Sequence, residues 1–126
     1  MKTVSLTALF LAFGIATGTA QADGHGTAPV SEANGILVDK NGMSLYTFDP
    51  DTSTSSACND GCAEAWPPLI APADSDELDK FTSITRDDGT RQWVYDGKPL
   101  YLWVNDQQPG DTTGDGVNNA WHLARP

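Results

Sequence analysis

The sequence predicts a mostly β fold: a small antiparallel β domain built from two related hairpin-containing halves, with one short helix at the cysteines. Asx-Gly pairs separate runs of β-favouring residues at three places, and they favour hairpin turns because both positions tolerate a positive φ. One motif also occurs twice, in the pattern Gly-x-x-Leu-Tyr-x-aromatic-x-x-Asp. The turns are Asn41-Gly42, Asp88-Gly89 and Asp96-Gly97, and the motif copies are Leu45–Asp51 and Leu100–Asp106.

The N-terminus has the pattern of a secretory signal peptide, with Lys2 before an apolar run and Ala20-Gln21-Ala22 as a small-x-small cleavage site. The run is too short to span a membrane, and no Cys stands directly after it as a lipid anchor would need. We therefore expect cleavage after Ala22, no membrane span or lipid anchor, and a periplasmic or secreted bacterial location. The expected organisation is a signal peptide at 1–22, a flexible tail at 23–34 and a single domain at 35–126, with repeats at about 35–75 and 81–126.

The first half should begin with a hairpin around Asn41-Gly42, whose second strand ends at Pro50 because proline lacks the N–H that a ladder needs. A short helix should follow the polar loop, and Pro67-Pro68 should end it. The expected segments are strands at 35–39 and 43–48, a loop at 51–57, the helix at 62–66, and an acidic connector at 70–80 with a turn of helix over 74–80.

The second half should contain two further hairpins, a long polar loop and a terminal strand. The expected strands are 81–85, 91–95, 98–104 and 120–124, and the loop is 105–119.

The doubled motif consists of Tyr46, Phe48 and Asp51 in one copy and Tyr101, Trp103 and Asp106 in the other. Because side chains alternate along a strand, each Tyr and the aromatic residue two positions later share a face, while the preceding Leu points the other way into the core. We predict that the two copies occupy equivalent positions in two superposable hairpins. Their aromatic faces should pack against Trp66 in one half and Trp121 in the other.

Two cysteines in an exported chain predict a disulfide between Cys58 and Cys62, since positions i and i+4 of a helical turn lie within bridging distance. Closing so small a ring should contribute only about 2 kcal/mol. The alternatives are a redox couple or a copper site, because the cysteines with His122 and Met43 resemble a soft copper-ligand set. His25, third after the expected cleavage site, is another copper-binding candidate.

The loop at 105–119 offers Asp106, Asp111 and Asp115 among glycines, and such hard oxygen donors suit Ca²⁺. The spacing matches an EF-hand loop poorly, since His122 stands where that loop needs Glu. Solvated turns capped by aspartate are the alternative reading.

The chain carries 17 Asp and Glu against 7 Lys and Arg, a formal net charge of −10. Such a surface repels nucleic acid and anionic lipid. Outside the tail, His122 is the only histidine, and the sequence contains no recognisable nucleophile–base motif. We therefore expect a monomeric, non-enzymatic module without a cofactor, which binds an envelope protein or a small ligand. A metal-binding protein, with calcium or copper, is the alternative.

The paired Tyr-x-aromatic-x-x-Asp segments resemble the bacterial secreted-repeat family described as predicted lipoproteins with a Yx(FWY)xxD motif. Other segments match too, and together they cover nearly all of residues 35–126. The resemblance implies export and a repeated unit, without a settled function. The matching segments are Ser56-Ala57-Cys58 through Cys62, Ala65–Leu69, Gly97–Tyr101, Pro109–Thr112, Gly114-Asp115-Gly116 and Trp121-His122.

Overall fold

The computed structural model describes residues 29–126, so the predicted signal peptide and residues 23–28 of the predicted tail lie outside the described part of the chain. Within 29–126, no helix is long and apolar enough to cross a membrane. The elements are strands β2 (Ser31–Ala33), β3 (Ile36–Val38), β4 (Tyr46–Phe48), β5 (Phe81–Thr85), β6 (Arg91–Tyr95), β7 (Lys98–Pro99) and β8 (Trp121–Leu123), with the α-helix α2 (Gly61–Ala65) and the 3₁₀ turn η3 (Val117–Asn119).

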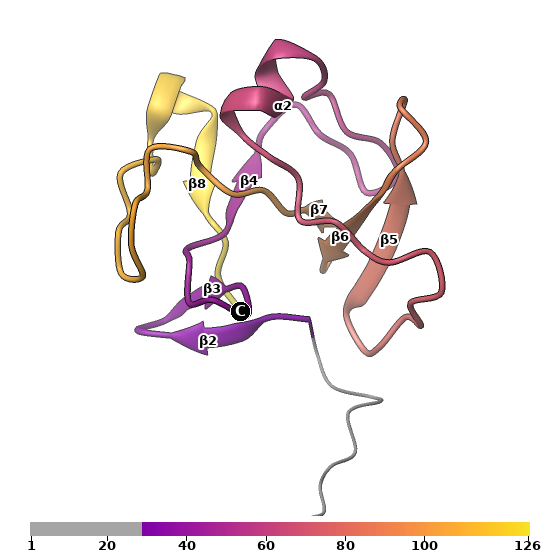
Figure 1. The fold of residues 1–126 in the computed structure, drawn as a ribbon, viewed down its shortest axis with the longest axis horizontal. Coiled ribbons are helices and arrows are strands. Elements are labelled where there is room, and N and C mark those ends of the chain that lie inside the picture. Colours follow the sequence, from indigo (N-terminus) through magenta and orange to yellow (C-terminus); the bar gives the residue numbers. More distant parts are fainter. Residues whose placement is uncertain (1–28) are drawn as a thin grey trace, which may run out of the picture.

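The strands form three small antiparallel sheets, β2–β3, β4–β8 and β5–β6–β7. In Figure 1 the β5–β6–β7 sheet stands on the right, β4 and β8 lie to its left, the β2–β3 hairpin crosses the bottom and α2 lies at the top. The predicted class is confirmed: the domain is mostly β and antiparallel, with two related halves and one short α-helix beside the cysteines.

Two of the predicted hairpins form as expected. β5 pairs with β6 from Phe81 opposite Tyr95 to Thr85 opposite Arg91. The β6–β7 turn has Asp96 at φ 50° and Gly97 at φ 82°, the left-handed pair that a tight hairpin turn requires.

The N-terminal hairpin differs from the prediction. Ser31–Ala33, which we placed in the flexible tail, forms β2 and pairs with β3 through a turn in which Asn34 and Gly35 both have positive φ. The alternation rule misses β2 because all of its residues are exposed. The turn at Asn41-Gly42 also forms, with Gly42 N donating to Asp39 O at 2.9 Å, but β4 then leaves β3 and pairs with β8.

Three other segments depart from the sequence prediction. The strand expected at 98–104 pairs with β6 only over Lys98–Pro99, and from Tyr101 onward its backbone N–H groups bond to the first half of the chain. The connector at 74–80 contains turns but no helix. The loop at 105–119 contains the 3₁₀ turn η3.

The buried side chains form two clusters on opposite sides of the motif segments. Leu45 and Leu100 belong to one cluster, while Tyr46 and Tyr101 belong to the other, as expected because neighbouring residues of an extended chain point in opposite directions. All four are fully buried. The leucine cluster also contains Val30, Leu37, Ala71, Phe81, Trp93 and Ala124, and the tyrosine cluster contains Cys58, Trp66 and Trp121.

Candidate functional site

The two motif tyrosines lie opposite each other in an antiparallel bridge. Tyr46 N donates to Tyr101 O at 2.8 Å, and Tyr101 N donates to Tyr46 O at 2.9 Å. The two motif copies therefore meet at the centre of the molecule. They occupy equivalent positions, as predicted, but in one shared pairing rather than in two separate hairpins.

Each tyrosine hydroxyl donates to the aspartate of the other motif copy. Tyr46 Oη lies 2.7 Å from Asp106 Oδ2, and Tyr101 Oη lies 2.5 Å from Asp51 Oδ2. The carboxylates also accept backbone N–H groups from the loops that follow them, at Thr113 and Ala57 respectively. Each aspartate thus ties its own loop to a tyrosine of the opposite half.

Burial and hydrogen bonding shift the pKa values of this cluster. Burial, reinforced by the Asp106 carboxylate, raises the pKa of Tyr46 far above its ordinary value. Burial and the hydrogen bond to Asp51 raise the pKa of Tyr101 to about 12. Burial also raises the pKa of Asp51, against the opposing effects of the Ala57 N–H and the Tyr101 hydroxyl. Both phenols therefore ionise less readily than an ordinary tyrosine.

Four aromatic rings stack beside the tyrosine pair. The ring centroids are 4.1 Å apart for Phe48 and Trp121, 3.8 Å for Trp121 and Trp66, and 3.9 Å for Trp66 and Trp103. The aromatic residue of each motif copy thus stacks on the tryptophan of the other half. Tyr46 contacts Trp66 edge-on, and Tyr101 contacts Trp121 in the same way.

Backbone hydrogen bonds repeat the same exchange between the halves. Leu69 N donates to Leu100 O at 2.9 Å, and the equivalent bond joins Ala124 N to Leu45 O at 2.8 Å. The segment that ends each half therefore completes the β structure of the other half. Neither repeat completes its hydrogen bonds or its aromatic stacking alone.

The predicted disulfide between Cys58 and Cys62 is present, with the Cα atoms 5.2 Å apart. Cys62 lies on α2, whereas Cys58 precedes the helix and is fully buried. The bridge therefore ties the loop after Asp51 to the helix, rather than joining two residues of one helical turn.

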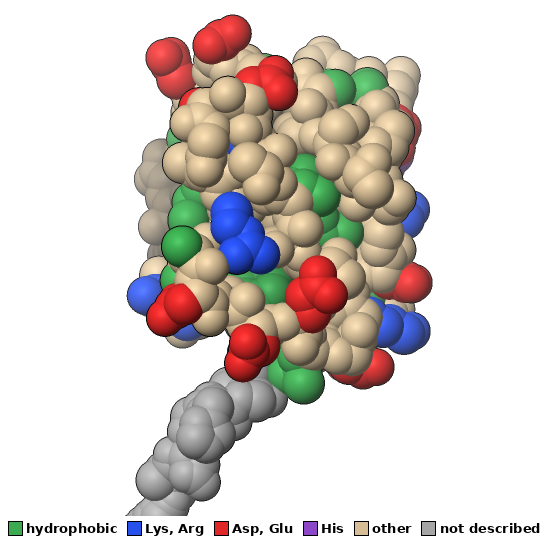
Figure 2. Space-filling view, turned by 90° about the vertical axis from the view of Figure 1, so that its right-hand side faces the viewer, with side chains coloured by type: hydrophobic (Ala, Val, Ile, Leu, Met, Phe, Trp, Pro, Cys, Tyr) green, Lys and Arg blue, Asp and Glu red, His purple; other side chains and the backbone are tan. Residues whose placement is uncertain are grey.

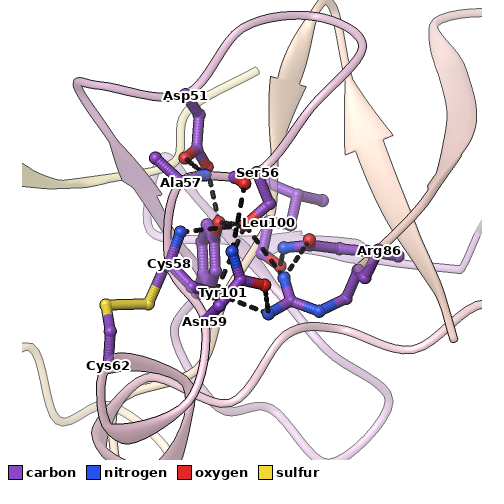
Figure 3. The surroundings of a disulfide bond; sticks show 10 residues. Asp51, Ser56, Ala57, Cys58, Asn59, Cys62, Arg86, Leu100 and Tyr101 are labelled. Carbon is purple, nitrogen blue, oxygen red and sulfur yellow. Dashed lines mark hydrogen bonds between the residues drawn. A yellow bond between two sulfur atoms is a disulfide. The ribbon is translucent and has the colours of Figure 1, made fainter. Parts of the chain in front are cut away.

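Arg86 is a buried residue that the sequence did not reveal as part of the site, because it follows β5 at what reads as an ordinary turn. Its Nη2 donates to Cys58 O at 2.5 Å, and its Nη1 donates to Ser56 Oγ at 2.9 Å and Gln92 Oε1 at 2.7 Å. Ser56 Oγ in turn lies 2.5 Å from Tyr101 Oη. Figure 3 shows the guanidinium pointing at the disulfide loop beside Tyr101.

A pocket of about 520 Å³ opens between α2 and the β5–β6 turn. Its lining combines apolar surface with carboxylates, and it includes Ile70, which is 51% exposed. Figure 2 shows acidic side chains at the upper end of this side of the molecule, where the β5–β6 turn lies in Figure 1, and others over its lower half. The lining residues are Asn59, Asp60, Ala63, Glu64, Pro68, Ile70, Arg86, Asp87, Asp88 and Thr90.

The structure does not bring the calcium candidates together. Asp106 bonds Tyr46, Asp111 accepts backbone N–H groups of its own loop, and Asp115 accepts the N–H of Leu123. Within 29–126, no group of three His, Cys, Asp or Glu side chains is placed to hold a metal ion.

Three residues of the predicted copper site, both cysteines and His122, have other partners in the structure. The disulfide consumes both thiols, and His122 Nε2 lies 3.0 Å from Asp49 Oδ2 in an exposed pair. His25 lies outside the described residues.

Comparison with known proteins finds a family model described as a secreted repeat of unknown function, which matches residues 28–70 and 82–125. Each matched segment contains one copy of the tyrosine motif, which confirms the resemblance and the two repeats. The first matched segment begins ahead of Gly35 and so includes β2. Neither the curated proteins nor the solved structures include a match to the chain.

Proposed function

Because the chain belongs to this family of secreted repeats, we propose that it is a non-enzymatic binding module of the cell envelope or extracellular space, exported by its signal peptide and cleaved after Ala22. The pocket between α2 and the β5–β6 turn carries the proposal, since a concave site of this volume is the usual place for a ligand. The crossed repeats and the disulfide hold its walls from both halves of the chain.

The lining of the pocket favours a cationic, partly apolar ligand, such as a basic segment of a partner protein. Asp60, Glu64 and Asp87 supply negative charge, while Pro68 and Ile70 supply apolar contact. The net charge of −10 adds long-range attraction for such a ligand.

Three features support a binding role over a catalytic one. The cysteines form a disulfide, so within 29–126 neither is a free nucleophile. The two buried phenols donate to carboxylates, and their raised pKa values disfavour the phenolate form that a catalytic base would need. His122 is paired with Asp49, and no nucleophilic side chain of the described residues hydrogen-bonds to it.

A peptide titration tests the site. We expect calorimetry to detect binding of an alternating Lys-Leu peptide and no binding of a Glu-Leu peptide of equal length. Replacing two pocket carboxylates, in Glu64→Gln/Asp87→Asn, should weaken binding roughly tenfold, and Ile70→Ser should weaken it comparably.

Matched controls lie on the same chain. Asp74→Asn/Asp76→Asn changes the net charge by the same amount as the pocket variant, but on the exposed connector. Val104→Ser removes an apolar side chain that is 52% exposed and does not line the pocket. Equal weakening by the pocket and control variants would mean that overall charge, not the pocket, governs affinity.

The metal-binding alternative is tested on the same sample. Calcium or copper should leave the melting temperature unchanged, because the loop carboxylates accept hydrogen bonds within the protein and the cysteines form a disulfide. A shift on adding Ca²⁺ that Asp111→Asn abolishes would favour the metal-binding function instead.

A further inference from the structure

The aromatic stack differs between its two ends. The two inner indoles, Trp66 and Trp121, are buried, while the outer rings Phe48 and Trp103 are partly exposed. An indole loses an electron far more readily than a phenyl ring. Trp103 is therefore the end of the stack at which a one-electron oxidant in solvent can remove an electron.

The path inward from Trp103 is continuous. Trp103 stacks on Trp66 at 3.9 Å between ring centroids, and Trp66 meets the edge of Tyr46 at 5.3 Å. Van der Waals contact between such rings couples their π systems, so an electron vacancy formed at Trp103 can move to Trp66 and then be filled from Tyr46.

Tyr46 is also equipped to release a proton when it is oxidised. A phenol that loses an electron becomes strongly acidic, and Asp106 Oδ2 accepts its hydrogen bond at 2.7 Å, within the range for direct proton transfer. Without an oxidant the same phenol keeps its proton, because burial and Asp106 raise its pKa. Electron and proton therefore leave Tyr46 together.

We infer that the protein has a second activity, in which it reduces diffusing one-electron oxidants through Trp103 and stores the oxidising equivalent at Tyr46. The oxidant gains one electron, taken from Trp103 and replaced through Trp66 from Tyr46. The Tyr46 O–H bond breaks, its proton moves to Asp106, and the products are the reduced oxidant, a neutral tyrosyl radical and a protonated Asp106. This activity uses the buried core and is independent of the pocket proposed as the binding site.

Flash photolysis tests the inference, with photogenerated tris(bipyridyl)ruthenium(III) as the oxidant and the mature chain as its substrate. We expect electron paramagnetic resonance of freeze-quenched samples to show a tyrosyl radical, whose spectrum narrows when the protein contains ring-deuterated tyrosine. Tyr46→Phe should lower the tyrosyl yield. The double variant Tyr46→Phe/Tyr101→Phe should shift the signal to a tryptophanyl radical, because Tyr101 meets Trp121 edge-on and donates to Asp51 as Tyr46 does to Asp106. Tyr95→Phe, which removes a partly buried tyrosine of the other core cluster, should leave the tyrosyl signal unchanged.

Two further variants test the entry point and the proton acceptor. Trp103→Phe should slow reduction of the oxidant, and Asp106→Asn should slow tyrosyl formation by about 10²-fold, the lower range for a positioned base. A tyrosyl yield that survives Tyr46→Phe but disappears in Tyr95→Phe would overturn the inference, as would an unchanged rate in Trp103→Phe. The deuterium labelling uses the unmutated chain and so does not depend on whether a variant folds. A radical spectrum that ring-deuterated tyrosine leaves unchanged would refute the inference.

Discussion

The crossed hydrogen bonds between the motif copies predict which pairs of mutations are coupled. Tyr46→Phe removes a buried hydroxyl that donates to Asp106 at 2.7 Å and accepts the Gly114 N–H at 3.1 Å. A hydrogen bond to a charged group contributes about 1.5–3 kcal/mol, and the orphaned N–H adds a desolvation cost of about 1–3 kcal/mol. We therefore expect Tyr46→Phe to lower the free energy of unfolding by about 3 kcal/mol.

A pair of double-mutant cycles separates the crossed arrangement from a within-copy arrangement. Combining Tyr46→Phe with Asp106→Asn should give a coupling energy of roughly 1–3 kcal/mol, because the two groups are direct partners. Combining Tyr46→Phe with Asp51→Asn, the aspartate of the same copy, should be additive within about 0.5 kcal/mol. Tyr101→Phe should instead couple to Asp51→Asn and be additive with Asp106→Asn.

Urea unfolding followed by tryptophan fluorescence measures these energies, provided that the m-value stays constant across the variants. Stronger coupling within a motif copy than between copies would refute the crossed structure. Equal coupling to both aspartates would show that the tyrosine bridge, rather than the hydroxyl contacts, transmits the effect.

Three further predictions concern the stack, the disulfide and the phenols. Gly114→Ala should lower the free energy of unfolding by roughly 1–3 kcal/mol, because a Cβ there would lie 2.8 Å from an inner indole of the stack. Gly61→Ala, where a Cβ would meet nothing within 4 Å, should be close to neutral in the same urea assay. Replacing Cys58 and Cys62 by Ala should lower the free energy of unfolding by about 2 kcal/mol, and an unchanged value would show that the bridge does not constrain the unfolded chain. The free energy of unfolding should fall as pH rises from 10 towards 12, because the unfolded phenol of Tyr101 ionises while the folded one keeps its proton. The loss attributable to Tyr101 should be roughly 2–3 kcal/mol, and Tyr101→Phe should make stability depend less steeply on pH in this range.

Much of the local structure follows from short-range sequence signals. The Asp96-Gly97 turn forms because both residues tolerate positive φ, and the β5–β6 pairing follows from β-favouring residues on each side of a turn. Strand β2 escaped prediction because its exposed residues carry no alternation. The strand expected at 98–104 pairs with β6 only as far as Pro99, because its partners from Tyr101 onward lie in the other half.

The candidate site was predictable only in part, for a similar reason. The doubled motif identified Tyr46, Tyr101 and their aspartates as equivalent, but spacing along a chain does not say whether a side chain bonds its own copy or the other one. Arg86 carried no signal, since its burial depends on the loop that the disulfide folds over it. The pocket has the same origin, because its walls come from segments far apart in the sequence.

The sequence by itself determined the class, the repeat, the disulfide and the turns, because each depends on residues close together in the chain. Only the tertiary structure decided that the halves exchange partners, with Tyr46 bound to Asp106 and Tyr101 to Asp51. The physical reason is that one half alone leaves its tyrosine hydroxyl and the second aromatic ring of its motif without partners, and both are satisfied only when the two copies pair across the centre.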